Sequence, residues 1–161
     1  MLAAILGGIL RGIGSFVPAS TPVIPLEALY FLTDVFILFG VMGLYGLQHE
    51  EAGLWGFFGF VLATVGIGII IGPDGSIAGV NVYPIGAGIF SVGLILLAIG
   101  SWRANKLPRW IPFLWILSMV VGSIGYFVHD LNLLFVISGV LFGWSFAGAG
   151  ISARIIASRR L

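Results

Sequence analysis

Long apolar stretches separated by short polar breaks dominate this chain of 161 residues. A helix that crosses a membrane needs about 20 predominantly apolar residues, and five stretches meet that length: 28–47, 53–72, 83–102, 110–128 and 131–152. A shorter stretch, residues 1–17, is a sixth candidate. The breaks carry turn-forming residues, as in PASTPVIP, GPDGSIAG and HDLN. The pattern predicts an all-α integral membrane protein, an antiparallel bundle of five to six transmembrane helices that forms a single domain over residues 1–161.

The composition agrees with this pattern. Apolar residues make up 60% of the chain and charged residues 8%, against roughly 45–50% and about 25% in soluble globular proteins. The chain has no cysteine, which excludes disulfides, thiolate chemistry and cysteine-ligated metal or iron–sulfur sites. No basic tract favours a nucleic acid partner, so the lipid bilayer is the partner that the composition indicates directly.

Charge is distributed unequally between the two sets of breaks. Alternation along the chain places QHEEAG, RANKLPR and the tail ARIIASRRL on one side of the membrane, and PASTPVIPLE, GPDGSIAG and HDLN on the other. The first side carries Arg103, Lys106, Arg109, Arg154, Arg159 and Arg160, whereas the second carries only acidic residues, Glu27, Asp74 and Asp130. The positive-inside rule therefore predicts a cytoplasmic C-terminus in the inner or plasma membrane.

The position of the N-terminus depends on residues 1–17. If they span the membrane, the N-terminus is cytoplasmic as well; if they lie along the interface, it is external and five spans remain. The opening residues lack the basic start of a signal peptide, and Arg11 interrupts their apolar run. We therefore expect this segment to remain in the mature protein.

Small residues recur at a spacing of four, which allows helix backbones to approach closely in lipid. The rows are Ala4, Gly8 and Gly12; Gly68 and Gly72; and Gly139, Gly143 and Ala147. We expect these rows to pack helices together within the bundle. The alternative is that they form a homo-oligomer or dock to another subunit of a membrane complex.

Two ionisable residues, Arg11 and Asp34, lie inside predicted helices. Small residues line the side of the first helix that carries Arg11, so we expect its side chain to face protein rather than lipid. Asp34 shares a helix face with Glu27 and Tyr30. At about 1.5 Å per residue, Arg11 and Asp34 both lie roughly 9–10 Å below the external boundary. We therefore predict an ion pair between Arg11 and Asp34, with further hydrogen bonds from Tyr30 and Glu27.

Further polar residues gather toward the external end of the predicted bundle. We predict that they form the mouth of a pocket whose floor holds Arg11 and Asp34; these residues are Tyr83, Tyr126, His129 and Asp130. Two other arrangements stay open. The ion pair can serve only to join the first two helices, or the Arg11 side chain can extend to the lipid headgroups.

We expect neither a cofactor nor a metal site. The two histidines, His49 and His129, fall on opposite sides of the membrane, about 30 Å apart, so they cannot ligate one haem. His129 and Asp130 form a candidate proton-handling or catalytic pair, because histidine titrates near neutral pH and a carboxylate can orient it. An ordinary solvated turn is the alternative.

The leading functional hypothesis is a small polytopic membrane protein that binds or transports a small or lipidic molecule in an outward-facing pocket around Arg11 and Asp34. The first alternative is an accessory or scaffold subunit of a larger membrane complex, suggested by the glycine rows. The second is a membrane-embedded enzyme that uses His129 and Asp130.

Overall fold

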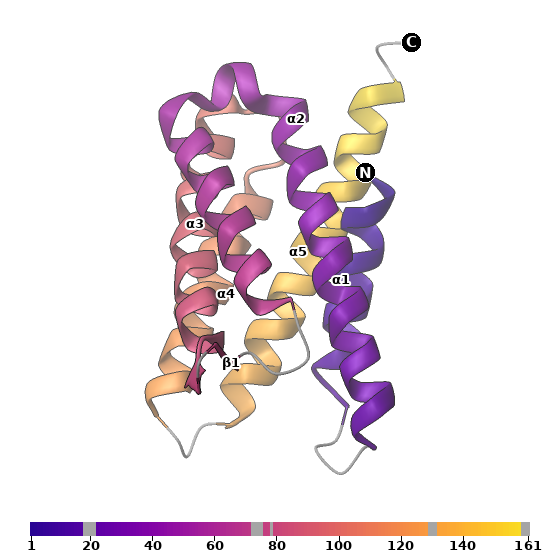
Figure 1. Cartoon of the computed structure of the whole chain (residues 1–161). Coiled ribbons are helices and arrows are strands. Elements are labelled where there is room, and N and C mark those ends of the chain that lie inside the picture. The colour runs from indigo at the N-terminus through magenta and orange to yellow at the C-terminus, as the bar shows by residue number, and fades with distance from the viewer. Residues whose placement is uncertain (18–21, 72–75, 78, 129–131, 159–161) are drawn as a thin grey trace.

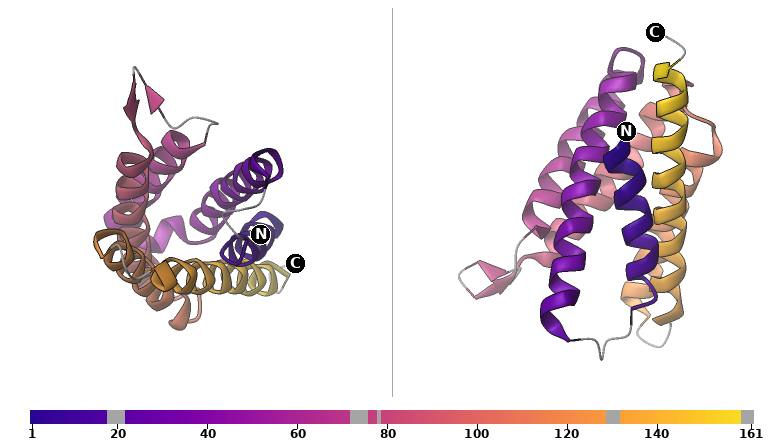
Figure 2. Two further views of the ribbon diagram at one scale, coloured as in Figure 1. Left: turned by 90° about the horizontal axis from the view of Figure 1, so that it is seen from below. Right: turned by 90° about the vertical axis from the view of Figure 1, so that its right-hand side faces the viewer.

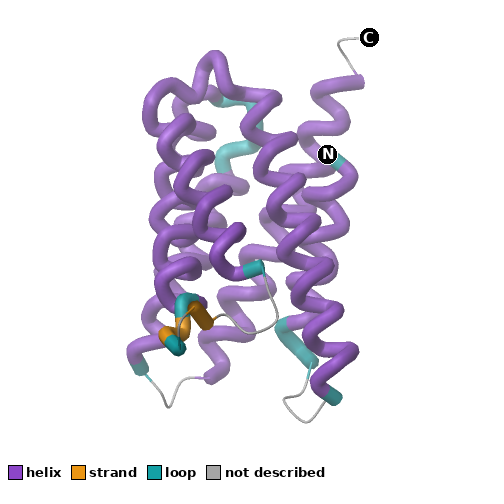
Figure 3. The backbone as a smooth tube through the Cα atoms, in the orientation of Figure 1, coloured by secondary structure: helices purple, strands orange, loops and turns teal. Residues whose placement is uncertain are grey.

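The structure is a computed structural model that describes residues 1–17, 22–71, 76–77, 79–128 and 132–158. This part of the chain folds almost entirely into helices, which confirms the predicted all-α class (Figure 1). The helices are α1 (Leu2–Gly14), α2 (Val23–Ile70), α3 (Tyr83–Ala104), α4 (Trp110–Phe127) and α5 (Asn132–Ser158). Two short strands, β1 (Ser76–Ile77) and β2 (Val80–Asn81), pair antiparallel before α3 (Figure 3).

Helix α2 folds back on itself. It runs along α1, crosses one end of the bundle and returns beside α3 (Figure 1). Of its 48 residues, only Gly53 has a non-helical backbone, with φ 62° and ψ −161°, a conformation that is essentially restricted to glycine. We call residues 23–52 the first arm of α2 and residues 54–70 its second arm.

The predicted helices 28–47 and 53–72 correspond to these two arms, but the prediction of a non-helical polar break between them was wrong. Residues 48–51 (QHEE) stay helical, because glutamine, histidine and glutamate all fit a helix and only glycine supplies the reversal. We call the end of the bundle where α2 reverses the turn end. The opposite end, which carries β1 and β2, is the ribbon end (Figure 3).

Helix α1 stands upright between α5 and the first arm of α2 (Figure 2). Of the two orientations expected for residues 1–17, the helix therefore has the one parallel to the bundle axis. It is 13 residues long, or about 20 Å at 1.5 Å per residue, which is shorter than a typical hydrocarbon core of about 30 Å. The helix ends early, at Gly14, where the Ser15 N–H and hydroxyl both donate to the Arg11 carbonyl oxygen at 3.2 and 2.9 Å.

Helix α5 joins two groups of helices. Seen from the ribbon end, α1 and the first arm lie toward one end of α5, and the second arm, α3 and α4 lie toward the other (Figure 2). Glycine allows the contact between α1 and α5, since a Cβ added to Gly8 would lie within 3.0 Å of the Ala147 nitrogen and the Gly143 oxygen. These two predicted small-residue rows thus pack against each other within the chain.

A second set of glycines, which the spacing of four did not reveal, joins α3 to the second arm of α2. These residues repeat at intervals of seven: Gly59 and Gly66 on the second arm, and Gly86, Gly93 and Gly100 on α3. A Cβ at any of them would meet the opposite helix at 3.0 Å or less. Seven is the repeat of helices that wrap around each other with a left-handed twist. Gly68, from a predicted row, has open space around it instead.

Within the residues that the structure describes, four helices are long and apolar enough to cross a membrane: Val23–Ile70, Tyr83–Ala104, Trp110–Phe127 and Leu133–Ser158. Large apolar side chains also cover the outside of the bundle, among them Phe58, which is 53% exposed, and Trp144, which is 72% exposed. Soluble monomers rarely expose extended apolar surface of this kind. These are the features of a membrane protein.

Candidate functional site

A large cavity lies between the two groups of helices, in the half of the bundle nearer the ribbon end. Its volume is about 1310 Å³, above the roughly 300–1,000 Å³ of common small-molecule sites. All five helices contribute to its wall. Six of the eight site residues predicted from the sequence line it: Arg11, Glu27, Tyr30, Asp34, Tyr83 and Tyr126. The other two, His129 and Asp130, lie outside the described residues.

One face of the first arm forms much of this wall. Glu27, Tyr30, Asp34 and Ile37 follow each other at helical spacing and all line the cavity, because residues three to four apart lie on the same side of a helix. Glu27 is exposed near the start of the arm, whereas Ile37 is only 4% exposed. The arm therefore leads from an open, acidic rim to a closed, apolar floor.

The predicted direct ion pair between Arg11 and Asp34 is wrong for this structure. Within the described residues, no nitrogen–oxygen distance of 4.0 Å or less joins the two side chains. The guanidinium carbon of Arg11 instead lies beside α5, 3.6 Å from the position that a Cβ on Gly139 would take. Both residues line the cavity, and the Arg11 guanidinium lies on the α5 side of it.

Tyr30 and Glu27 likewise make no hydrogen bond with Arg11 or Asp34 among the described side chains. The groups are still near one another across the cavity. The electrostatic surroundings of Tyr83, on α3, include Arg11, Asp34 and Tyr30, and Arg11 is the charge that acts on Asp34. The cavity thus separates an arginine and an aspartate that remain within electrostatic range.

Hydroxyl groups line the cavity between the charged residues and its floor. Four of them donate their proton to a backbone carbonyl oxygen within hydrogen-bond distance: Thr33 to Leu29 at 2.7 Å, Ser91 to Ala87, Ser118 to Trp115 and Ser138 to Ser118, each at 2.8 Å. A hydroxyl that already donates can only accept further bonds. Of these four residues, Ser91 is partly exposed and can offer an acceptor to a bound molecule, whereas Thr33, Ser118 and Ser138 are buried.

Apolar side chains close the cavity toward the turn end. Its floor includes Ile67, Ile95 and Phe142, and the Phe90 ring meets Phe142 edge-on with ring centres 6.0 Å apart. Beyond the floor lies a solid core of fully buried side chains, which we call the turn-end core: Val41, Leu44, Leu94, Leu97, Trp115 and Phe146. The cavity thus has its polar rim at one end and a sealed end near the middle of the bundle.

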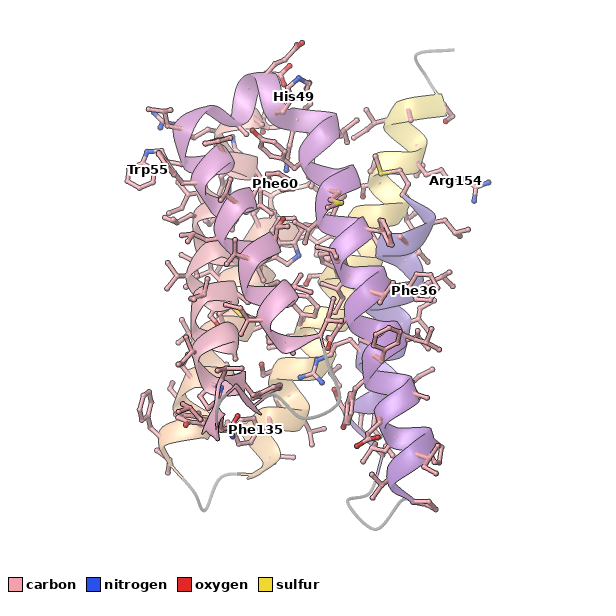
Figure 4. All side chains as sticks on the ribbon, in the orientation of Figure 1. Phe36, His49, Trp55, Phe60, Phe135 and Arg154 are labelled. Carbon is pink, nitrogen blue, oxygen red and sulfur yellow. The ribbon has the colours of Figure 1, made fainter. Side chains whose placement is uncertain are left out.

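Large apolar side chains on the cavity wall keep much of their surface accessible. Phe31, Val92 and Phe135 line the cavity, yet their exposed fractions are 52%, 52% and 44%. Figure 4 places Phe135 near the ribbon end. These side chains therefore offer accessible apolar surface to a molecule in the cavity.

A polar cluster at the turn end was missed in the sequence. Gln48 is fully buried and its amide nitrogen donates to the Ser101 hydroxyl at 2.7 Å, while its amide oxygen has no partner. Nearby, Lys106 pairs with Glu51 and donates to the Leu47 carbonyl oxygen at 3.2 Å. The sequence pattern places residues 48–51 in the break QHEEAG between two helices, although Gln48 continues the buried face of the first arm at helical spacing. His49 points out at this end (Figure 4).

Comparison of the chain with known protein families, with curated proteins and with solved structures gave no match. The assignment of function therefore depends on the site itself.

Proposed function

We propose that the protein binds or transports a small or lipidic molecule in a membrane, through the cavity between its two groups of helices. One observation carries the proposal: a cavity of about 1310 Å³ with Arg11, Glu27 and Asp34 on its wall, in a chain of which only 8% is charged. Charged residues at membrane depth are costly and are usually retained for function. A large, mostly apolar pocket with a few polar groups is the usual form of a ligand site.

In this proposal six segments form the membrane bundle. The two arms of α2 cross it separately, α3, α4 and α5 cross it once each, and α1 adds a shorter sixth segment. Basic residues near the turn end, Arg103, Lys106, Arg109 and Arg154, support a cytoplasmic turn end and C-terminus by the positive-inside rule. The cavity then faces the outside of an inner or plasma membrane.

The two alternatives have less support. The scaffold hypothesis came from the small-residue rows, and the rows on α1 and α5 are occupied by their contact with each other. The enzyme hypothesis depends on His129 and Asp130, which are not among the described residues.

Filling the cavity tests the proposal. The full chain, purified in an uncharged detergent, is expected to carry a non-protein mass in native mass spectrometry. Ser91→Phe places a ring in the cavity and should remove that mass, because Ser91 lines the wall. Val65→Phe is the matched control, since Val65 is 47% exposed and does not line the cavity.

Accessibility gives a second readout that needs no bound molecule. Because the chain has no cysteine, Ser91→Cys introduces a single thiol in the cavity and Ser145→Cys introduces one at a site that is 0% exposed. An impermeant thiol reagent added outside cells should modify the first and spare the second. An unreactive Ser91→Cys, together with a wild-type chain that carries no extra mass, refutes the proposal.

A further inference from the structure

Arg11 and Asp34 are two opposite charges for which the described part of the chain provides no ion-pair partner. Both are partly buried, and within the described residues neither side chain makes an ion pair or a hydrogen bond. An intramembrane charge usually pairs with another charge or with backbone carbonyls, because an unpaired charge in lipid is costly. A molecule bound in the cavity between these residues can therefore supply the opposite charges with which Arg11 and Asp34 pair.

The charges on the wall determine which molecule satisfies both. A purely anionic ligand at Arg11 would leave Asp34 unpaired and would meet repulsion from Glu27, which also lines the cavity. A purely cationic ligand at Asp34 would leave Arg11 unpaired. A ligand that carries both signs pairs with each residue, since guanidinium binds carboxylate and phosphate groups well and an ammonium group complements a carboxylate.

The uncharged groups of the wall fit the same arrangement. The partly exposed Ser91 hydroxyl donates to the Ala87 carbonyl oxygen, so it can only accept from a ligand, and an ammonium group is a pure donor. Three tyrosines on the wall, Tyr30, Tyr83 and Tyr126, offer phenol donors for an anionic group. Their ring faces also attract an ammonium group.

The remaining wall fits an apolar chain. Phe31, Val92 and Phe135 line the cavity and about half of each side chain is accessible, so they offer apolar surface to an apolar chain. From these observations we propose that the cavity binds a zwitterionic amphiphile. Its anionic group pairs with Arg11, its ammonium group pairs with Asp34, and its apolar chain lies on this aromatic and aliphatic wall. This inference rests on the proposed function and names the class of ligand.

The test compares amphiphiles of one chain length that differ in the charge of the headgroup. Lysophosphatidylethanolamine is the zwitterion, lysophosphatidylglycerol is the anion and an alkyl trimethylammonium is the cation. Each is titrated against the purified full chain in uncharged detergent, and the bound fraction is measured by native mass spectrometry. The zwitterion should bind at least about tenfold more tightly than either singly charged amphiphile. Free glycerophosphoethanolamine, which has the headgroup without the chain, should bind much more weakly.

Two charge variants should shift the preference for the zwitterion toward opposite singly charged amphiphiles. Arg11→Gln should favour the cationic amphiphile, because only acidic residues then remain among the described charges of the wall, and Asp34→Asn should favour the anionic one. Lys106→Gln, at the other end of the bundle, is the control and should leave the preference unchanged.

The outcomes separate the two proposals. If no amphiphile binds, the zwitterionic-amphiphile inference is overturned, while the proposed function is decided separately by the copurified mass and by the reactivity of Ser91→Cys. If the anion or the cation binds as tightly as the zwitterion, or if Asp34→Asn leaves the preference unchanged, the cavity still binds amphiphiles but the zwitterion inference is overturned. If the free headgroup competes as well as the full amphiphile, the assignment of the apolar chain is overturned.

Discussion

Replacing Gly93 by alanine should push α3 away from the second arm of α2. The added Cβ would lie within 3.0 Å of three backbone atoms, the carbonyl carbon of Leu62 and the nitrogen and Cα of Ala63. Ordinary contacts begin at 3.4 Å, and backbone atoms in a helix cannot rotate away as a side chain can. The two helices must separate, and overpacking of this kind costs about 1–3 kcal/mol. Alanine regains about 1 kcal/mol of helix propensity, so the free energy of unfolding should fall by up to about 2 kcal/mol.

Gly88→Ala is the matched control on the same helix, because a Cβ at Gly88 would meet nothing within 4 Å. This variant gains the helix propensity without the overlap, so its stability should stay equal to the wild type or rise by up to about 1 kcal/mol. The measurement is reversible unfolding in mixed micelles at increasing SDS fraction, followed by circular dichroism. Midpoints that move in the same direction by similar amounts for both variants would show that the close helix contact does not control stability.

Three further substitutions probe the turn end, each followed by the same unfolding assay. Ser101→Ala should lower the free energy of unfolding by about 1–3 kcal/mol, because it removes the hydrogen-bond partner of the buried Gln48 amide. Gln48→Leu should lower it by less, because it removes the unpaired amide oxygen as well. Equal losses for the two variants would contradict this account. Gly53→Ala should cost about 1–3 kcal/mol from backbone strain alone, since its Cβ has open space; an unchanged midpoint would show that the reversal does not need glycine. Lys106→Gln should cost under about 1 kcal/mol, because its contact with the half-exposed Glu51 is screened by water, and the loss should shrink at 1 M salt.

The sequence predicts the helical class well, because membrane helices have a strong signal in length and hydropathy. The expected helix 83–102 is found as α3, Tyr83–Ala104, and the expected helix 110–128 as α4, Trp110–Phe127. The reversal of α2 was harder to predict, since residues 48–52 combine polar side chains with good helix propensity. The sequence does not show whether a loop or a sharply bent helix joins the two arms. The backbone angles of Gly53 in the structure show that it is a bent helix.

The candidate site shows where sequence reasoning ends. Counting residues along a helix gives the depth of Arg11 and Asp34, and both lie on the wall of one cavity. The depth of a residue does not give the direction in which its side chain points around the helix axis. That direction depends on contacts such as Gly8 against Gly143, which hold α1 against α5 and leave space between Arg11 and Asp34.

The depth of the cavity decides how a charge inside it would respond to the membrane potential. From Glu27 to Ile37 the first arm descends about 15 Å at 1.5 Å per residue, half of a hydrocarbon core of about 30 Å. Water in that space would extend the potential of the side that the cavity faces down to the floor, so most of the voltage would fall across Trp115, Phe146 and the rest of the turn-end core. A full crossing costs about 2.3 kcal/mol per elementary charge at 100 mV. The affinity for a ligand at the floor would be almost independent of voltage. Electrical work would arise only when a net charge moved past the turn-end core.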